Sequence, residues 1–569
     1  MRIPIDEKTG IFLFLMFSYT LWAQTPAPGG ISSNLQVWVK ADAGTATTTD
    51  NSKVPVWENQ KTGGVNGIAN QGMPGYYADP GIGAIPAYRT ATSIPNFNFN
   101  PAIEIVSTNG YRSGYKFPSG FPDNTTNALT SYTHLSRTVS ASYRTVFVMN
   151  GTTRSSNTSL IAGIWQSPFF GTQGNRPEFY NEKESGDVFF GTNTITTVGT
   201  EVPSIQSYYN RLSGTNMNYL FGNNGLEYGQ PSNGVSSTFN YPGMVLLMDN
   251  DAGSGSTSLA GDRIGEFILY SGTQTDSERQ RVNSYLAVKY GVTLVQPQDY
   301  IASDETVITW NSSLNTAFNN NIFGLAKDDD SALKQLVTNS INTENNSMLI
   351  ISTDNDFVSA NSKPDRSDFL QDRTFLLIGD NNDQSLTLVN SGTAPGQRIQ
   401  RIWLAQRKND TGSTWLQADL SAYTSILATD KIFMIIADDS ALSQNVQVIP
   451  AAGFTGGKAV FSYSFPDNKY FTFGTNIQTY CTKDPAAGTP NEMTKFGITA
   501  QSRQMNWPAN IPNGFIALES KNKGFVITRT TAANIAVPVE GMLIYDTVDK
   551  CFKLYNGTGW NCIIRSCND

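Results

Sequence analysis

The chain offers few side chains for nucleophilic or metal-assisted catalysis. His134 is the single histidine among 569 residues. An HExxH zinc helix needs two histidines, so His134 cannot form one. A Ser-His-Asp triad would have to use His134, but the sequence has no GxSxG turn to carry the serine. A GxxxxGK[ST] phosphate loop and a dinucleotide-type GxGxxG are also absent from the sequence. The polar stretch from Tyr132 to Leu135 is typical of a loop or a strand edge, so we expect a structural or solvent-exposed histidine.

Paired carboxylates are the remaining route to catalysis, because glycosidases need only two Asp or Glu side chains about 5 to 9.5 Å apart. Glu266 stands alone in an apolar stretch, between Gly265 and Phe267. A lone carboxylate in such a place is more often a hydrogen-bonded structural group than a catalyst. We therefore assign no catalytic residue.

Aspartate-rich turns offer the hard oxygen ligands that Ca²⁺ takes. Asp249 and Asp251, followed by Gly253, resemble the start of a calcium loop, but Ala260 stands where an EF-hand needs its twelfth-position glutamate. Similar clusters occur at residues 328–330 and 380–383. Solvated turn carboxylates are the more common alternative. Asp249 and Asp251 are thus candidate Ca²⁺ ligands, and we expect no other cofactor.

All four cysteines lie in the last 89 residues, at Cys481, Cys551, Cys562 and Cys567. They include no CxxC pair and have no histidine nearby, which argues against zinc and in favour of disulfides in a small exported module. The Asn556-Gly557 turn predicts a hairpin that brings Cys551 and Cys562 near one another, leaving Cys481 for Cys567. With Tyr555 facing Trp560, Cys562 meets Cys551 only diagonally unless a bulge shifts the register, so the other pairings stay open.

The rest of the sequence predicts a β-rich scaffold for these residues. Only 15% of the residues are charged, 64 are aromatic, and the length suits three or four domains. Short runs rich in Val, Ile, Phe, Tyr and Thr alternate with Gly, Asn, Pro and Ser clusters, which indicates a sandwich or barrel. The net charge of −8 argues against a nucleic-acid or anionic-membrane partner.

Two segments depart from this β pattern. Residues 275–278 form a capping box, and apolar residues follow at helical spacing until Gly291, which predicts one helix at the end of the first domain. Residues 1–23 resemble a signal peptide, with an apolar run of about 12 residues, too short for the ~20 of a spanning helix. We expect cleavage before Gln24, no transmembrane segment afterwards, and a protein that is secreted or on the outer cell surface. A membrane anchor is the alternative.

Four segments in order carry a resemblance to a known fold. They are Leu35-x-Val37-Trp38-Val39-Lys40-Ala41-Asp42-Ala43-Gly44, Val56-Trp57-Glu58-Asn59-Gln60, Phe97-Asn98-Phe99-Asn100-Pro101-Ala102, and Glu266-Phe267-Ile268-Leu269-Tyr270 with residues 285–292. Residues 30–296 thereby resemble the concanavalin A/laminin-G-like jelly rolls of secreted Bacteroidetes proteins. The resemblance implies a two-sheet sandwich in a superfamily of lectins, adhesion modules and glycan-cleaving enzymes. Jelly-roll hydrolases of this kind carry an ExDxxE strand motif, which this sequence lacks.

Two further regions resemble parts of the same surface proteins. Residues 297–478, with pieces at 322–329 and 401–404, resemble the accessory β-sandwich that often follows the jelly roll. Residues 479–490 form a linker, and residues 491–569 resemble a cysteine-containing C-terminal module of flavobacterial surface proteins. The expected fold class is therefore all-β: a concanavalin A-like jelly-roll sandwich, a second β-sandwich and a small disulfide-linked β-rich module.

These observations favour an exported, non-catalytic protein that mediates adhesion or binds a glycan. The alternative is an extracellular glycoside hydrolase or lyase acting on polysaccharide. Aromatic side chains in Gly-rich loops are the candidate sugar contacts, since sugar rings stack on such groups; core packing is the competing use of each. The candidates are Tyr76, Tyr77, Tyr88, Tyr111 and Tyr115. The expected partner is a glycan or a surface protein.

Overall fold

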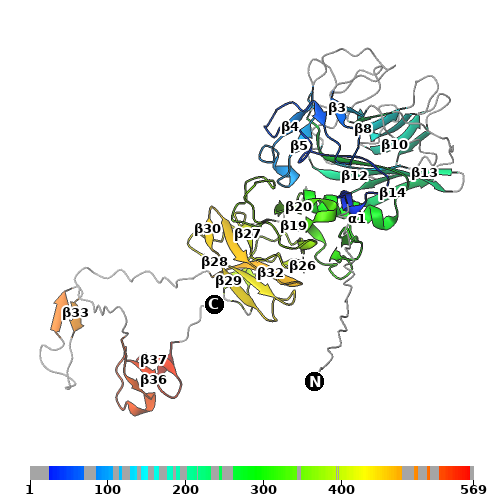
Figure 1. Ribbon diagram of the computed structural model, residues 1–569. Coiled ribbons are helices and arrows are strands. Elements are labelled where there is room, and N and C mark those ends of the chain that lie inside the picture. The colour runs from blue at the N-terminus through cyan, green and yellow to red at the C-terminus, as the bar shows by residue number, and fades with distance from the viewer. Residues whose placement is uncertain are drawn as a thin grey trace, which may run out of the picture. The chain divides into compact units, whose positions relative to one another are not determined.

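The computed structural model (Figure 1) divides into two compact units, residues 1–477 and 478–569. It describes residues 25–69, 85–106, 114–117, 129–136, 143–150, 159–165, 176–182, 188–191, 202–213, 216–231, 243–246, 261–342, 348–392, 394, 396–476, 493–496, 509–512 and 525–563. Within these residues no helix is long and apolar enough to span a membrane.

Two antiparallel eight-stranded sheets form the first sandwich. The first sheet contains β1 (Leu35–Lys40), β4 (Ala87–Arg89), β5 (Ala102–Glu104), β7 (Leu129–Ser136), β12 (Ser204–Ser213), β13 (Asn216–Asn223), β14 (Leu226–Pro231) and β16 (Arg263–Ser271). The second contains β2 (Val56–Trp57), β3 (Gly67–Ala69), β6 (Tyr115–Phe117), β8 (Tyr143–Asn150), β9 (Ser159–Trp165), β10 (Arg176–Glu182), β11 (Val188–Gly191) and β15 (Gly243–Leu246). One apolar core, with Val39, Phe267, Trp57 and Phe117, joins them.

The helix α1 (Asp276–Tyr290) follows β16 directly, and its ends match the sequence prediction. At its start, the Glu278 amide donates to the Thr275 hydroxyl and the Thr275 amide donates to the Glu278 carboxylate, as a capping box requires. Gly291 ends the helix in the left-handed region at φ 64°. Val282, Leu286 and their apolar neighbours are buried on more than one side, so α1 is an internal layer and not a surface helix.

A second sandwich follows α1. Its larger sheet contains β19 (Asn320–Asp328), β20 (Leu333–Gln335), β23 (Thr374–Asp380), β24 (Val389–Asn390), β25 (Gln397–Arg398), β26 (Trp403–Lys408), β28 (Lys431–Ala437), β29 (Gln447–Pro450) and β32 (Lys469–Asn476). The smaller contains β21 (Val337–Asn339), β22 (Leu349–Ser352), β27 (Thr414–Asp419), β30 (Gly453–Thr455) and β31 (Lys458–Tyr463), and β17 (Tyr300–Ile301) pairs with β18 (Ile308–Trp310) outside both. Trp403, Phe461 and Phe473 lie in the core between the sheets.

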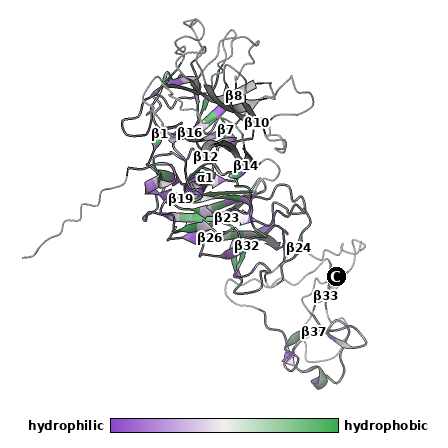
Figure 2. Ribbon diagram, turned by 90° about the vertical axis from the view of Figure 1, so that its right-hand side faces the viewer, coloured by the Kyte–Doolittle hydropathy of each residue, from purple (hydrophilic) through white to green (hydrophobic). Residues whose placement is uncertain are grey.

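Both views show α1 between the two sandwiches, with β12 and β14 on one side and β19 on the other (Figures 1 and 2). The apolar cluster around α1 explains this placement. Trp38 and Ile268 reach it from the first sandwich, while Ile322 and Leu377 reach it from the second. Residues 25–476 are thus built as two sandwiches on one buried helix.

The described part of the C-terminal unit is small and β-rich. A two-stranded sheet contains β33 (Met493–Phe496) and β34 (Ala509–Pro512). A four-stranded sheet contains β35 (Arg529–Thr530), β36 (Leu543–Asp546), β37 (Cys551–Tyr555) and β38 (Trp560–Cys562). A disulfide joins Cys551 to Cys562. The all-β class, with two sandwiches followed by a disulfide-linked module, is confirmed. The assignment of the first sandwich to the concanavalin A/laminin-G group stays a prediction.

Candidate functional site

Glu266 is the centre of a buried polar cluster between β16 and α1. Its carboxylate is fully buried and accepts hydrogen bonds from Trp38 Nε1 at 2.6 Å, Tyr285 Oη at 2.8 Å and Tyr290 Oη at 3.2 Å. Lys289 Nζ lies 2.8 Å from the same carboxylate. Helical spacing places Tyr285 and Lys289 on one face of α1, which is why both reach it. Glu266 is therefore a hydrogen-bonded structural carboxylate, as the sequence predicted.

Asp42 and Lys40 extend this cluster towards the surface. Lys289 Nζ also contacts Asp42 Oδ1 at 3.0 Å, and the Asp42 side chain is 24% exposed. Burial alone would raise the pKa of Asp42, but the ammonium groups of Lys289 and Lys40 outweigh it and lower the pKa to about 2. Burial would lower the pKa of Lys289, but the two carboxylates raise it. The four charges thus balance as two cations and two anions.

His134 lies beside this cluster, inside β7. The strand pairs with β12 and β16, so the prediction of a loop or strand edge was wrong and that of a structural histidine holds. The imidazole stacks on Tyr290 with ring centroids 3.7 Å apart, and neither ring nitrogen has a hydrogen-bond partner. Burial, with a smaller contribution from Lys289, holds its pKa well below the usual value. The ring is fully buried and packs between Phe97 and Tyr290.

A second polar cluster, which sequence reasoning missed, binds the C-terminal end of α1. Asn98 and Asn100 donate from their side-chain amides to the Lys289 carbonyl at 3.0 and 2.9 Å. Gln335 Nε2 donates to the Asn98 carbonyl at 3.0 Å, and the Asn339 amide donates to Asn98 Oδ1 at 2.8 Å. The cluster satisfies a helix carbonyl that would otherwise lack a partner. It also ties the first sandwich to the second.

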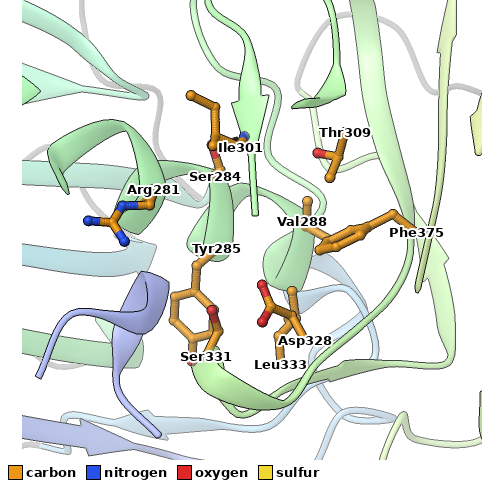
Figure 3. Close-up of a pocket in the computed structure, with 10 residues that line it drawn as sticks. All are labelled: Arg281, Ser284, Tyr285, Val288, Ile301, Thr309, Asp328, Ser331, Leu333 and Phe375. Atoms are coloured by element: carbon orange, nitrogen blue, oxygen red, sulfur yellow. Dashed lines mark hydrogen bonds between the residues drawn. The ribbon is translucent and has the colours of Figure 1, made fainter. Parts of the chain in front are cut away.

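The cavity beside α1 is too small for a ligand (Figure 3). It has a volume of about 10 Å³, whereas small-molecule sites need several hundred. This is about the smallest volume that can hold one water molecule. Asp328 and Tyr285 line it together with Val288, Leu333 and Phe375. Burial raises the pKa of Asp328 although the Ser303 hydroxyl donates to it at 2.5 Å, which again is a structural arrangement.

Of the aspartates at residues 328–330 and 380–383, Asp328 and Asp380 are buried within the second sandwich. Asp380 is fully buried, lies 3.3 Å from Arg401 Nε and accepts from both the Asn321 side chain and the Asn382 amide. Burial raises the pKa of Asp380, against the opposing effect of Arg401. Among the described residues no three His, Cys, Asp or Glu side chains come together as metal ligands.

The predicted ligand contacts divide by location. Tyr115 is fully buried and donates to the Val54 carbonyl at 2.9 Å, and Tyr88 is also buried. Burial raises the pKa of Tyr88 to about 12. In this structure both rings pack in the core of the first sandwich and face no solvent. The remaining candidates, Tyr76, Tyr77, Tyr111, Asp249 and Asp251, lie outside the described residues.

The C-terminal hairpin has the register that its turn predicts. Tyr555 faces Trp560 and Lys553 faces Cys562. Cys551 and Cys562 are bonded diagonally with Cα atoms 5.8 Å apart, so the Cys551–Cys562 pairing is confirmed. Cys481 and Cys567 lie outside the described residues, and their pairing stays a prediction.

Comparison with known protein families gives two partial matches. Residues 278–469 match a domain of unknown function (DUF8202), a segment that begins inside α1 and runs through the second sandwich. Residues 508–568 match the phage tail like trimerisation region. No curated protein matches the chain.

Three solved structures are similar to parts of this chain at low sequence identity. Domain 4 of AbnA, a GH43 extracellular arabinanase from Geobacillus stearothermophilus in complex with arabinotriose, is 13% identical over 44% of this chain and 98% of its own, with a TM-score of 0.29. The binding domain of botulinum neurotoxin DC in complex with SialylT is 10% identical. The match covers 79% of this chain and 96% of that domain, with a TM-score of 0.31. Trypanosoma rangeli sialidase is 10% identical. The match covers 45% of this chain and 33% of the sialidase, with a TM-score of 0.25. None is close enough to bear on the activity of this chain.

Proposed function

We propose that the chain is an exported, non-catalytic binding protein that assembles into trimers through its C-terminal module. The observation that carries the proposal is the match of residues 508–568 to a trimerisation region. Three copies joined at one end would present three pairs of sandwiches, and linked copies bind a multivalent surface far more tightly than a single copy does. The expected target is a glycan or a surface protein, bound by the first sandwich.

The buried cluster around Glu266 supports the non-catalytic part of the proposal. Its carboxylate already accepts from Trp38, Tyr285, Lys289 and Tyr290, and the cavity that Tyr285 lines has a volume of only about 10 Å³. A glycosidase needs two carboxylates facing an open cleft. The carboxylates of Glu266 and Asp42 are instead joined by Lys289, which contacts both.

Two experiments test the proposal. Light scattering on the full chain after signal removal should give three times the mass of one chain, and a monomer or a dimer at micromolar concentration would overturn the assembly. The same material on a glycan array, combined with reducing-end assays on plant and algal polysaccharides, tests the activity. Binding without release of reducing ends is the expected result. Steady release of reducing ends would establish the polysaccharide-acting enzyme instead.

Export has its own test. N-terminal sequencing of protein from the native host should begin at Gln24, because the apolar run that precedes it resembles a signal peptide. An intact Met1 would contradict this part of the proposal and leave the trimer untouched.

A further inference from the structure

The four-stranded sheet of the C-terminal unit has two faces of opposite character. Side chains alternate along a strand, so the pairing register assigns each residue to a face. Leu543 pairs with Leu554 and Tyr545 with Phe552 on one face, and the Ile563 amide continues the ladder by donating to the Phe552 carbonyl. We call these five residues the apolar face.

The opposite face carries polar and covalent contacts, together with Ile544 and the Tyr555–Trp560 ring pair. Lys553 Nζ lies 3.0 Å from Asp546 Oδ2 and also contacts Asp549. Asp546 accepts from the Ala532 and Val548 amides at 2.9 Å and is almost fully buried. The Cys551–Cys562 disulfide lies on the same face, one residue out of phase with Phe552. This face is complete within one chain.

The apolar face is open to solvent. Leu543 is 42% exposed, Phe552 50%, Leu554 40% and Ile563 56%. Tyr545 and Phe552 contact each other edge to face with ring centroids 5.5 Å apart. At one edge of this face Arg529 lies over the Tyr545 ring, 5.8 Å from its centroid, and Asn561 pairs with Leu554 on the other side. Large exposed apolar patches are uncommon on monomeric proteins and mark interaction sites.

The described part of the module, residues 525–563, has little apolar interior of its own. Of the apolar side chains in residues 525–563, Ile544 is the only one that is buried. Domains this small need a disulfide, a metal or association with other chains, because their own core buries too little surface. The disulfide supplies one of these, and association through the open face would supply another.

We propose that the apolar face is the contact by which three copies of this chain associate. The inference rests on the proposed trimer, since residues 508–568 match a trimerisation region and contain the whole face. In the trimer, Phe552 and Leu554 on β37 are the central anchors, because groups that become fully desolvated near the middle of an interface carry most of the binding free energy. The face that holds Lys553 and the disulfide points away from the contact.

The test compares two changes on adjacent positions of β37 in the full chain. In the double variant Phe552→Glu/Leu554→Glu, like charges from three copies would meet at the contact, and the midpoint concentration for assembly should rise at least 100-fold. Lys553→Gln changes the opposite face of the same strand and should assemble like the wild type. Light scattering over a dilution series gives the midpoint, and thiol titration reports whether Cys551–Cys562 still forms.

The outcomes separate the two levels of the proposal. A wild-type trimer, a monomeric double variant with its disulfide intact, and a trimeric Lys553→Gln protein support the inference. A double variant that stays trimeric overturns the apolar face as the contact and leaves the proposed trimer standing. If Lys553→Gln also dissociates with its disulfide intact, the contact is not confined to the apolar face and the inference fails. A monomeric wild type overturns the trimer itself.

Discussion

The two sandwiches and the C-terminal module are each stabilised internally, but in different ways. Residues 25–476 have three large apolar clusters, one within each sandwich and one around α1, and can therefore bury a complete ion network at Glu266. The described part of the module buries the side chain of Ile544 and relies on the Cys551–Cys562 disulfide. A longer chain segment buries a larger fraction of its surface. The described part of the large unit is therefore stabilised by its apolar interior, whereas the described part of the small unit depends on a covalent bond.

Removal of the Glu266 carboxylate is the strongest test of whether the buried ion network stabilises the large unit. In Glu266→Ala, Lys289 keeps one carboxylate partner, and the donors on Trp38, Tyr285 and Tyr290 lose their acceptor. Breaking a buried ion pair in this way costs about 3–5 kcal/mol. Urea unfolding followed by tryptophan fluorescence should show this loss in the free energy of unfolding.

Asp276 provides the matched control for Glu266. It pairs with Arg279 on the same helix, but its side chain is 92% exposed, so Asp276→Ala should cost less than about 1 kcal/mol. Equal losses from the two variants would mean that the Glu266 cluster adds nothing beyond an ordinary surface ion pair, and the comparison between the two regions would fail.

Removal of the Cys551–Cys562 disulfide tests whether the C-terminal module depends on this bond. In the chain-entropy treatment, a bridge that closes a loop of about ten residues contributes roughly 2.5–3 kcal/mol. Cys551→Ser/Cys562→Ser should therefore speed hydrogen exchange in residues 543–562 and leave the exchange of α1 unchanged. Faster exchange in both units would contradict the separate stabilisation of the module.

Local features were predictable from the sequence, and the distant partners of Glu266 were not. The capping box of α1 and the hairpin register at Tyr555 each depend on residues a few positions apart, and the structure confirms both. Trp38 and Glu266, in contrast, are 228 residues apart. Each belongs to a segment that carries the family resemblance, but periodicity along one strand does not show which distant strand will face it.

His134 and Asn98 show why the remaining site residues were missed or misplaced. Polar neighbours made the strand around His134 resemble an edge, yet Phe97 and Tyr290 cover it and make the position internal. Asn98 lies at φ 50°, a left-handed position that asparagine tolerates, but its role depends on the Lys289 carbonyl 191 residues away. Such contacts follow from the packing of sheets on α1, which no local pattern encodes.

A smaller effect should follow from adding one methyl group beside the Glu266 cluster. A Cβ at Gly265 would lie 2.7 Å from His134 Nδ1 and 2.8 Å from the Tyr290 ring. Overpacking of a dense core costs about 1–3 kcal/mol, so Gly265→Ala should lower the melting temperature of the sandwiches. Gly453→Ala is the control, because a Cβ there meets nothing within 4 Å. A melting temperature unchanged in Gly265→Ala would show that the core around α1 is looser than described.

The smallest expected effect is the loss of the stability that Asp42, the partly exposed member of the Glu266 cluster, contributes as the pH falls. The pKa of Asp42 is lowered from 3.8 to about 2. A depressed carboxyl pKa stabilises the folded state above the unfolded-state value, and this stability is lost as the pH falls from about 4 to 2. Because the side chain is partly exposed, solvent screening reduces the contribution to about 1 kcal/mol. At pH 5 the wild type should therefore be more stable than Asp42→Asn by this amount, and the difference should shrink towards pH 2. Urea unfolding of both proteins from pH 5 to pH 2 measures it, and a difference that stays constant over this range would show that the ion pair with Lys289 does not stabilise the fold.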